Sequence, residues 1–288
     1  MRKAILAVAL ATAAFAVPDP ATAQAAAPAP AAAPASRHTI AGNADLFSSY
    51  RFRGIDQTFG KPALQGGIGY SHESGFYAGN WNSNVNQGAG YPGGNLEMDF
   101  YGGWKKIWGD WGLDLGGIYY YYPGTNALRT GPILIRNNRT LNIHTGSVHN
   151  SELYIAGSWK FISLKYFDAV SDYFSTPNTK NSGYLDLSAN YDLGDGWGVN
   201  GHLGHLDFKN MSNGNYTDWK IGVTKDLSGW VVGLSYIDTN AKGNCGGATV
   251  AKPQPYCFTN GNFSAAGVAG KTKDAGRSTF VLSVSKTF

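Results

Sequence analysis

The sequence has no long hydrophobic run beyond its first residues, and it has few charged side chains. After Val17, no window approaches the roughly 20 apolar residues that a membrane-spanning helix requires. Only 15% of the residues are charged and the formal net charge is +4, which is not the dense basic surface that nucleic-acid binding requires. These absences exclude a helical membrane anchor and a nucleic-acid partner.

Cysteine is also scarce, because the chain has only Cys245 and Cys257. Both lie in one segment rich in glycine, asparagine and proline. Two thiols without a nearby third ligand do not make a zinc site, so no metal is expected. In an oxidising compartment the pair predicts a local disulfide.

The first residues predict export. Two basic residues precede a short apolar run, and residues 21–23 read Ala-Thr-Ala, an A-x-A cleavage pattern. This pattern predicts a signal peptide over residues 1–23. Residues 24–38 are dominated by alanine and proline and predict a stiff periplasmic tail. Residues 39–288 then form the single folded domain.

Glycine and aromatic residues are abundant, with 39 Gly, 17 Tyr, 14 Phe and 8 Trp. Runs that alternate apolar and polar residues recur through this domain, and each run is bounded by turn-forming residues. An even number of strands keeps both termini on the periplasmic side of a bacterial barrel. The twelve predicted strands cover residues 40–53, 62–73, 75–85, 94–106, 111–122, 150–160, 161–168, 183–193, 197–207, 217–226, 230–238 and 277–288.

The connections between these strands alternate in length. Every second link is a tight turn, and the links between the tight turns are longer, most of all at residues 123–149 and 239–276. A soluble β-sandwich has no reason for such alternation. The pattern therefore predicts an all-β fold, a single antiparallel transmembrane β-barrel of about 12 strands with periplasmic termini.

The last strand predicts the location and two partners. It alternates up to Phe288, except that Lys286 occupies the apolar register, where its long side chain would extend to the headgroups. A terminal aromatic on a closing strand is typical of bacterial outer-membrane barrels. We expect the barrel-assembly machinery to bind this strand, and outer-membrane lipid and lipopolysaccharide to surround the barrel.

Aromatic residues also sort to the strand ends. Tryptophans lie beside the short turns and tyrosines collect near the long links, which predicts aromatic girdles at the two membrane surfaces. The tryptophans are Trp108, Trp111, Trp159, Trp197 and Trp230, and the tyrosines are Tyr50, Tyr119, Tyr120, Tyr121, Tyr122, Tyr166 and Tyr236.

Alternation further predicts which charges face the lumen. A charge on the lipid face near the midplane costs about 2–4 kcal/mol, so the charged register should point inward. On the first strand this places Tyr50 and Phe52 toward lipid. A water-filled passage is one interpretation, and an interior salt-bridge network that plugs a narrow barrel is the other. The predicted pore-lining residues are Asp45, Arg51, Arg53, Glu97, Asp99, Asp114, Glu152, Lys165, Asp186, Asp192 and Lys220.

Arg51 and Arg53 form the most specific candidate for solute contact. Two guanidiniums on one wall bind carboxylate or phosphate groups in a bidentate manner. The structural alternative is an ion pair across the barrel with Glu97, Asp99 or Asp45. Both roles are compatible within one site.

Residues 42–124 resemble a proteobacterial family of outer-membrane porins, the TorF type, which are conserved hypothetical Gcw-type proteins. The tail, residues 282–288, fits as well, whereas the likeness is thinner across 125–149 and 239–276. The resemblance implies an outer-membrane channel without a known solute. The matching blocks are residues 49–55 (SYRFRGI), 61–67 (KPALQGG), 74–79 (SGFYAG), 94–103 (GNLEMDFYGG) and 121–124 (YYPG).

These observations lead to one functional hypothesis and two alternatives. The hypothesis is a channel, not an enzyme, for passive diffusion of small hydrophilic solutes, with anionic solutes as one option and no cofactor. An adhesin or structural anchor that acts through its long extracellular loops is the first alternative. A barrel hydrolase is the second, but no G-x-S-x-G or H-E-x-x-H motif occurs. His202 and His205 are three residues apart on a strand and should point to opposite faces. The sequence does not specify the transported solute, the ion selectivity or the oligomeric state. It also does not specify whether the lumen is open or plugged, or what the two long loops do.

Overall fold

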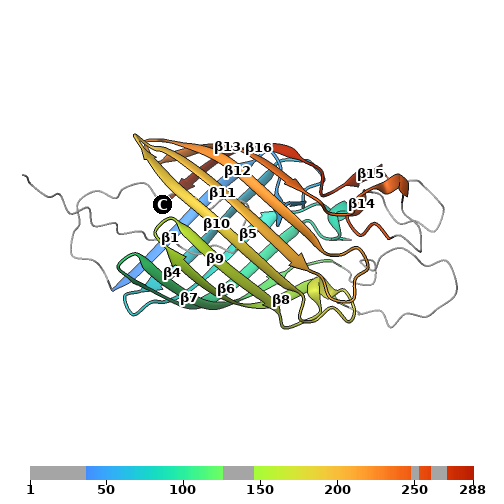
Figure 1. Cartoon of the computed structure of the whole chain (residues 1–288), viewed down its shortest axis with the longest axis horizontal. Coiled ribbons are helices and arrows are strands. Elements are labelled where there is room, and N and C mark those ends of the chain that lie inside the picture. The colour runs from blue at the N-terminus through green and yellow to red at the C-terminus, as the bar shows by residue number, and fades with distance from the viewer. Residues whose placement is uncertain (1–36, 92, 126–145, 248–252, 261–270) are drawn as a thin grey trace, which may run out of the picture.

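Twelve antiparallel strands form a closed barrel in the computed structural model of the chain (Figure 1). The structure describes residues 37–91, 93–125, 146–247, 253–260 and 271–288. The predicted signal peptide and most of the predicted tail lie outside the described residues. Within the described residues, no helix has the length and hydrophobicity needed to cross a bilayer.

The prediction of an all-β, twelve-stranded antiparallel barrel is confirmed. The strands of the wall are β1 (His38–Phe47), β4 (Ala63–His72), β5 (Phe76–Asn84), β6 (Leu96–Trp108), β7 (Trp111–Tyr121), β8 (His149–Trp159), β9 (Ile162–Ala169), β10 (Gly183–Gly194), β11 (Trp197–Asp207), β12 (Tyr216–Leu227), β13 (Trp230–Thr239) and β16 (Thr279–Thr287). The shorter elements are β2 (Arg51–Phe52), β3 (Ile55–Asp56), β14 (Cys257–Asn260), β15 (Lys271–Asp274), η1 (Gln87–Ala89), η3 (Tyr173–Ser175) and η4 (Cys245–Gly247).

The barrel closes between its first and last strands. β1 pairs with β4 on one side and with β16 on the other. The final residue takes part, because the Phe288 N–H donates to Gly42 O at 2.8 Å and the Gly42 N–H donates to Phe288 O at 3.2 Å. Closure leaves the wall without a free edge, as a membrane-spanning sheet requires.

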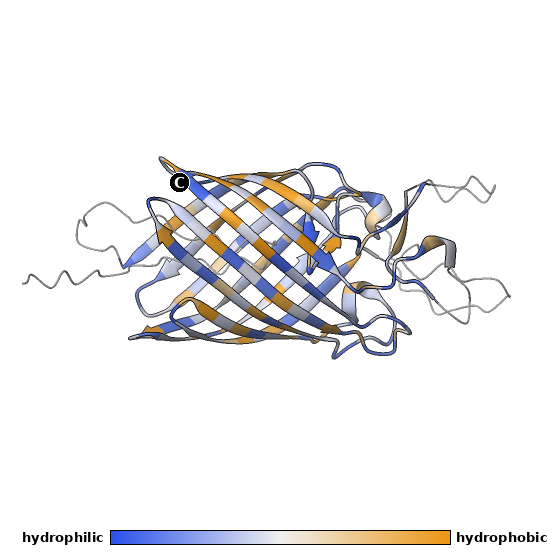
Figure 2. Cartoon of the chain, turned by 45° about the horizontal axis from the view of Figure 1, so that its top comes forward, coloured by the Kyte–Doolittle hydropathy of each residue, from blue (hydrophilic) through white to orange (hydrophobic). Residues whose placement is uncertain are grey.

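The links alternate in length as predicted. The short links lie at the end of the barrel that carries the carboxyl terminus, and the β14–β15 hairpin projects from the opposite end (Figure 1). Hydropathy alternates along the wall strands that face the viewer in Figure 2. Large apolar side chains such as Leu64, Ile68 and Leu153 are exposed on the outside. The outer surface is therefore the apolar belt that a bilayer contacts.

One wall strand departs from this apolar belt. β5 carries Asn80, Asn82 and Asn84 in the register that faces outward. The Asn80 amide donates to Asp99 O at 2.9 Å, the Asn82 amide donates to Asn80 Oδ1 at 2.6 Å, and the Asn84 amide donates to Pro62 O at 3.2 Å. These bonds satisfy amide donors that would otherwise lie unpaired beside lipid.

The first predicted strand is wrong beyond Phe47, where β1 ends. Residues 49–58, named here the inner hairpin, leave the wall and are all buried. Within it β2 pairs with β3, with Phe52 opposite Ile55. The prediction that Tyr50 and Phe52 face lipid is also wrong, because they are 3% and 7% exposed inside the barrel. A two-residue turn causes the reversal.

That turn lies at Arg53 and Gly54, whose φ angles are 48° and 76°. Two consecutive positive φ values are the geometry of the tight hairpin turn that favours glycine at its second position. A Cβ at Gly54 would lie 2.4 Å from Thr239 Cγ2 and 2.7 Å from Asp218 Cβ. Glycine therefore supplies both the backbone conformation and the close approach of the turn to β12 and β13.

The tyrosine girdle needs a similar correction. Tyr119 and Tyr166 are exposed near the long links, as predicted. Tyr120 and Tyr122 are 1% exposed and point into the barrel, as Tyr50 does. In β7 successive tyrosines alternate between the two faces, so only every second one contributes to the outer girdle.

A disulfide joins Cys245 and Cys257 with an S–S distance of 2.07 Å. It closes part of the link between β13 and β16, next to β14, where Cys257 pairs with Asp274. Both half-cystines lie outside the twelve-stranded wall.

Replacing both cysteines with serine is expected to loosen this link without altering the barrel. Closing a loop of this size stabilises the cross-linked segment by about 3 kcal/mol, while the hydrogen bonds of the wall remain. Limited proteolysis should cut the variant faster between β13 and β16, and its mobility shift on heating should match that of the oxidised protein. A lower temperature for that shift would contradict this expectation.

Candidate functional site: the interior of the barrel

The inner hairpin is held to the wall by a buried ion pair. Arg53 Nη1 and Nη2 lie 2.9 and 2.8 Å from the two carboxylate oxygens of Glu152 on β8. Their side chains are 3% and 1% exposed. This is the bidentate geometry in which guanidinium and carboxylate bind most strongly. The turn of the hairpin is thus attached to the far wall.

Further groups surround this pair. The Glu152 carboxylate also accepts hydrogen bonds from Asn150 at 3.1 Å and from the Tyr120 hydroxyl at 3.2 Å. Arg53 donates to the Tyr173 hydroxyl at 3.0 Å, and its guanidinium lies 4.2 Å from the centre of the Tyr184 ring. Burial raises the pKa of Tyr173 to about 12, so this phenol stays neutral. Each charge has several partners, as a buried ion pair requires.

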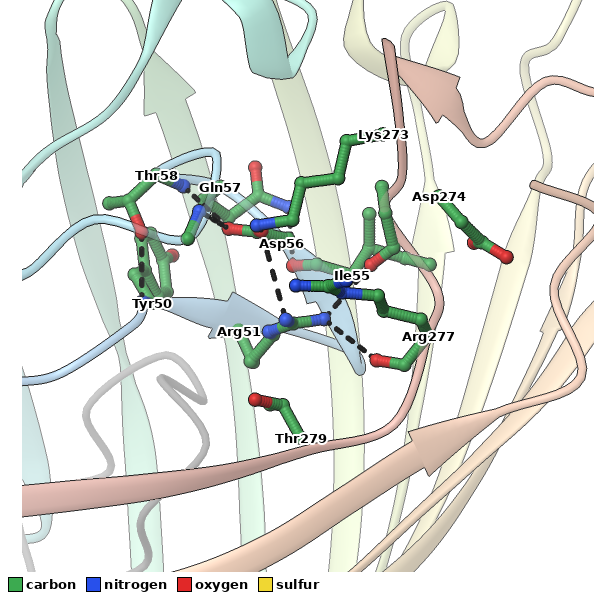
Figure 3. A network of polar contacts seen from close by, with 12 residues as sticks. Tyr50, Arg51, Ile55, Asp56, Gln57, Thr58, Lys273, Asp274, Arg277 and Thr279 are labelled. Atoms are coloured by element: carbon green, nitrogen blue, oxygen red, sulfur yellow. Dashed lines mark hydrogen bonds and ion pairs between the residues drawn. The ribbon is translucent and has the colours of Figure 1, made fainter. Parts of the chain in front are cut away.

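Arg51 attaches the base of the hairpin to the β15–β16 link (Figure 3). Its guanidinium donates to Ala275 O at 3.0 Å and to Arg277 O at 3.2 Å. It also lies 3.7 Å from Asp56, whose carboxylate is 2.6 Å from the Lys273 ammonium. Segments more than 200 residues apart in the sequence are joined at this point.

Aromatic side chains fill the space between the hairpin and the wall. The Tyr50 ring lies edge-on to Trp81 of β5 at 5.6 Å, and the Phe52 ring lies edge-on to Tyr120 of β7 at 5.6 Å. The Tyr216 hydroxyl of β12 donates to Arg53 O at 2.8 Å. The hairpin therefore contacts the wall on several sides and crosses the lumen in its long-link half.

A second group of polar contacts lies on the wall away from the hairpin. The Tyr77 hydroxyl donates to Asp114 Oδ1 at 2.6 Å and is hydrogen-bonded to the Tyr154 hydroxyl. The Lys165 ammonium lies 3.7 Å from the centre of the Tyr154 ring, a cation–π contact. Charges of both signs face the lumen here.

His202 joins two carboxylates across three strands. Its Nδ1 lies 2.8 Å from Asp186 Oδ2, and its Nε2 lies 3.1 Å from Asp218 Oδ2. His205 points outward, where it is hydrogen-bonded to Thr217 Oγ1 at 2.9 Å. The expectation that the two histidines face opposite sides is confirmed.

The sequence did not lead us to name Asp218 or His202 as lumen residues, or to predict the inward course of residues 49–58. The inward direction of Asp218 could have been predicted from strand alternation, because Asp218 lies two residues before the predicted lumen residue Lys220. His202 lies opposite Lys220 in the β11–β12 pairing. The Arg-Gly turn between two apolar residues was the local signal for the hairpin.

The predicted pore-lining residues occupy three kinds of position. Arg51 and Arg53 belong to the inner hairpin rather than to the wall, and their carboxylate partners are Asp56 and Glu152 instead of Asp45, Glu97 or Asp99. Asp192 is exposed at the short-turn end, where it accepts a hydrogen bond from the Gly194 N–H at 2.8 Å. The others lie on the inward register of the wall: Asp45, Glu97, Asp99, Asp114, Glu152, Lys165, Asp186 and Lys220.

Comparison with known proteins places the chain in a family. Residues 31–288 match the profile of a family described as bacterial protein of unknown function (Gcw_chp). The chain belongs to this family. No curated protein matches it.

Several solved outer-membrane barrels are similar to the chain. The NanC porin is 8% identical with a TM-score of 0.45, over 87% of this chain and 99% of that one. OmpT of Vibrio cholerae is 10% identical with a TM-score of 0.41, over 87% and 97% of the two chains. OprD from Pseudomonas aeruginosa is 11% identical with a TM-score of 0.37, over 86% and 65%.

Proposed function

We propose that the protein is an outer-membrane channel of the TorF type, through which small hydrophilic solutes diffuse passively past the inner hairpin. The observation that carries this proposal is the sorting of side chains across the wall. Apolar residues cover the outside, while hydrogen-bonded and charged residues such as Asp114, Lys165 and Asp186 line the inside. A polar lumen with charges of both signs suits hydrated solutes.

The inner hairpin makes this a narrow channel. Its ten residues are buried inside the lumen and contact the wall at β5, β8 and β12. Solutes would pass between the hairpin and the wall, and larger ones would require the hairpin to move. The same proposal includes two partners. The barrel-assembly machinery would bind β16 during assembly, and outer-membrane lipid and lipopolysaccharide would surround the barrel.

An anionic solute is not part of the proposal. The two guanidiniums that suggested it are already bound inside the protein, Arg53 by Glu152 and Arg51 by Asp56 and two carbonyl groups. An entering anion would have to compete with a bidentate carboxylate at 2.8 and 2.9 Å. Neither Arg51 nor Arg53 is therefore an uncompensated cation that an anion could bind.

The test is single-channel recording of the refolded protein in a planar bilayer. We expect discrete steps that are small for a twelve-stranded barrel, because the hairpin occupies part of the cross-section. Folding is checked by the mobility shift on heating. A folded barrel that gives no steps would contradict the channel.

The anchor or adhesin is the second candidate, and the buried hairpin is the observation that favours it. A lumen held closed by Arg53 and Glu152 leaves the long links as the functional part, with the Cys245–Cys257 segment presented beyond the wall. Exchange of the 239–276 link for a short turn distinguishes the two. The anchor loses attachment to its target surface. The channel still conducts, with larger steps, because the exchange also removes the contacts of Lys273 and Ala275 with the inner hairpin.

A further inference from the structure

A row of polar side chains crosses the lumen face of four neighbouring strands. Asp45 of β1 lies opposite Gln65 of β4, which lies opposite Ser83 of β5. Ser83 lies opposite Glu97 of β6, and Asp99 follows two residues along the same face. All five are buried. These residues are named here the polar row.

The polar row contains buried acceptors that lack hydrogen-bond donors. Among the described residues, nothing donates to Gln65 Oε1, Glu97 Oε2 or Asp99 Oδ1, which belong to side chains 3%, 1% and 2% exposed. Asp45 Oδ1 and the hydroxyl oxygen of Ser49 in the inner hairpin are in the same condition. A buried acceptor without a donor is destabilising, because folding removes its hydrogen bonds to water without replacing them. The Gln65 amide and the Ser49 hydroxyl also lack a hydrogen-bond partner, so the missing partners are not confined to the carboxyl groups.

The polar row also lacks basic partners. Elsewhere in the barrel, Glu152 is paired with Arg53, Asp56 with Lys273, and two other aspartates with His202. None of the ion pairs found in the described part of the chain includes a carboxylate of the polar row. A nearby positive charge favours the ionised form of a carboxyl group, so a cation bound between these neighbouring carboxylates would stabilise their charges.

The oxygen atoms of the polar row indicate which kind of cation it binds. In the described residues, no three histidine, cysteine or carboxylate side chains converge as they would on a metal ion, which argues against a divalent metal centre. Amide, hydroxyl and carboxyl oxygens suit a monovalent ion or an ammonium group. Trp81, which lies opposite Asp99, and Tyr50, 5.6 Å from it, add aromatic faces that attract cations.

We infer that the polar row is a binding subsite for monovalent cations and makes the channel cation-selective. The inference rests on the proposed channel function and names its solute class. Acidic side chains are the usual device by which a pore favours cations over anions. The permeating species would be an alkali ion or a small primary ammonium compound.

The test measures the zero-current potential across a planar bilayer with a salt gradient. The wild type is compared with a Glu97→Gln, Asp99→Asn double variant, first in potassium chloride and then in methylammonium chloride. The matched control is Asp110→Asn, Asp195→Asn, which removes two carboxylates from exposed short turns. Folding of every variant is checked by heat modifiability.

We expect the wild type and the control to prefer the cation, and the double variant to lose that preference while it still conducts. Selectivity for potassium alone would assign the subsite to alkali ions, and selectivity in both salts would extend it to ammonium groups. A conducting double variant with unchanged selectivity would overturn the inference and leave the channel intact. A wild-type barrel without conductance would overturn both.

Discussion

Replacing Arg53 with alanine is expected to release the inner hairpin and to raise the single-channel conductance. The substitution removes both hydrogen bonds to Glu152 and leaves that carboxylate buried, with 1% of its side chain exposed. Removing one partner of such a pair costs about 3–5 kcal/mol. The wall is held by its own closed hydrogen-bond network, so the substitution destabilises mainly the packing of the hairpin against the wall. Movement of the hairpin toward solvent hydrates Glu152 and widens the passage.

Two companion variants make this result specific. Lys160→Ala removes a cation from an exposed pair with Asp110, whose atoms are 3.9 Å apart; such pairs contribute about 0–1 kcal/mol, and we expect no change in conductance. The Arg53→Ala, Glu152→Ala double variant leaves no uncompensated charge at this pair. Its single-channel conductance should therefore rise less than that of Arg53→Ala alone. If Arg53→Ala lowers the unfolding temperature but keeps the wild-type conductance, the hairpin does not control the passage.

Replacing Gly204 with valine is expected to impair folding of the barrel. A Cβ at Gly204 on β11 would lie 1.9 Å from the Tyr184 hydroxyl oxygen and 2.9 Å from Asp218 Oδ1. Tyr184 cannot move aside, because it is 1% exposed and donates to Asp218 at 3.0 Å. Overpacking of this kind costs about 1–3 kcal/mol, and the Tyr184–Asp218 hydrogen bond is lost in addition.

Gly157→Val is the matched control. Gly157 lies on β8, and a Cβ there meets no atom within 4 Å. Valine suits a strand, so this variant should unfold in guanidinium at the wild-type concentration or slightly above it. Gly204→Val should unfold at a clearly lower concentration, or refold in low yield. Equal midpoints for the two variants would show that Tyr184 adapts, against our expectation.

The polar row was only partly visible in the sequence. Alternation placed Asp45, Glu97 and Asp99 on the inward register, and in the structure all three side chains are buried. It did not indicate that Gln65 and Ser83 complete a continuous row, because that depends on the register between strands. It also did not indicate which lumen carboxylates have basic partners.

Sequence patterns alone predicted the twelve strands, the alternation of short and long links, and the inward or outward direction of most side chains. These features depend on a two-residue period and on turn residues, both of which are local. The tertiary structure decided where residues 49–58 go, because a wall strand and an inward hairpin share the same period. It also decided the pairing of Arg53 with Glu152. That contact joins residues 99 positions apart, and its energy depends on burial that exists only once the barrel has closed.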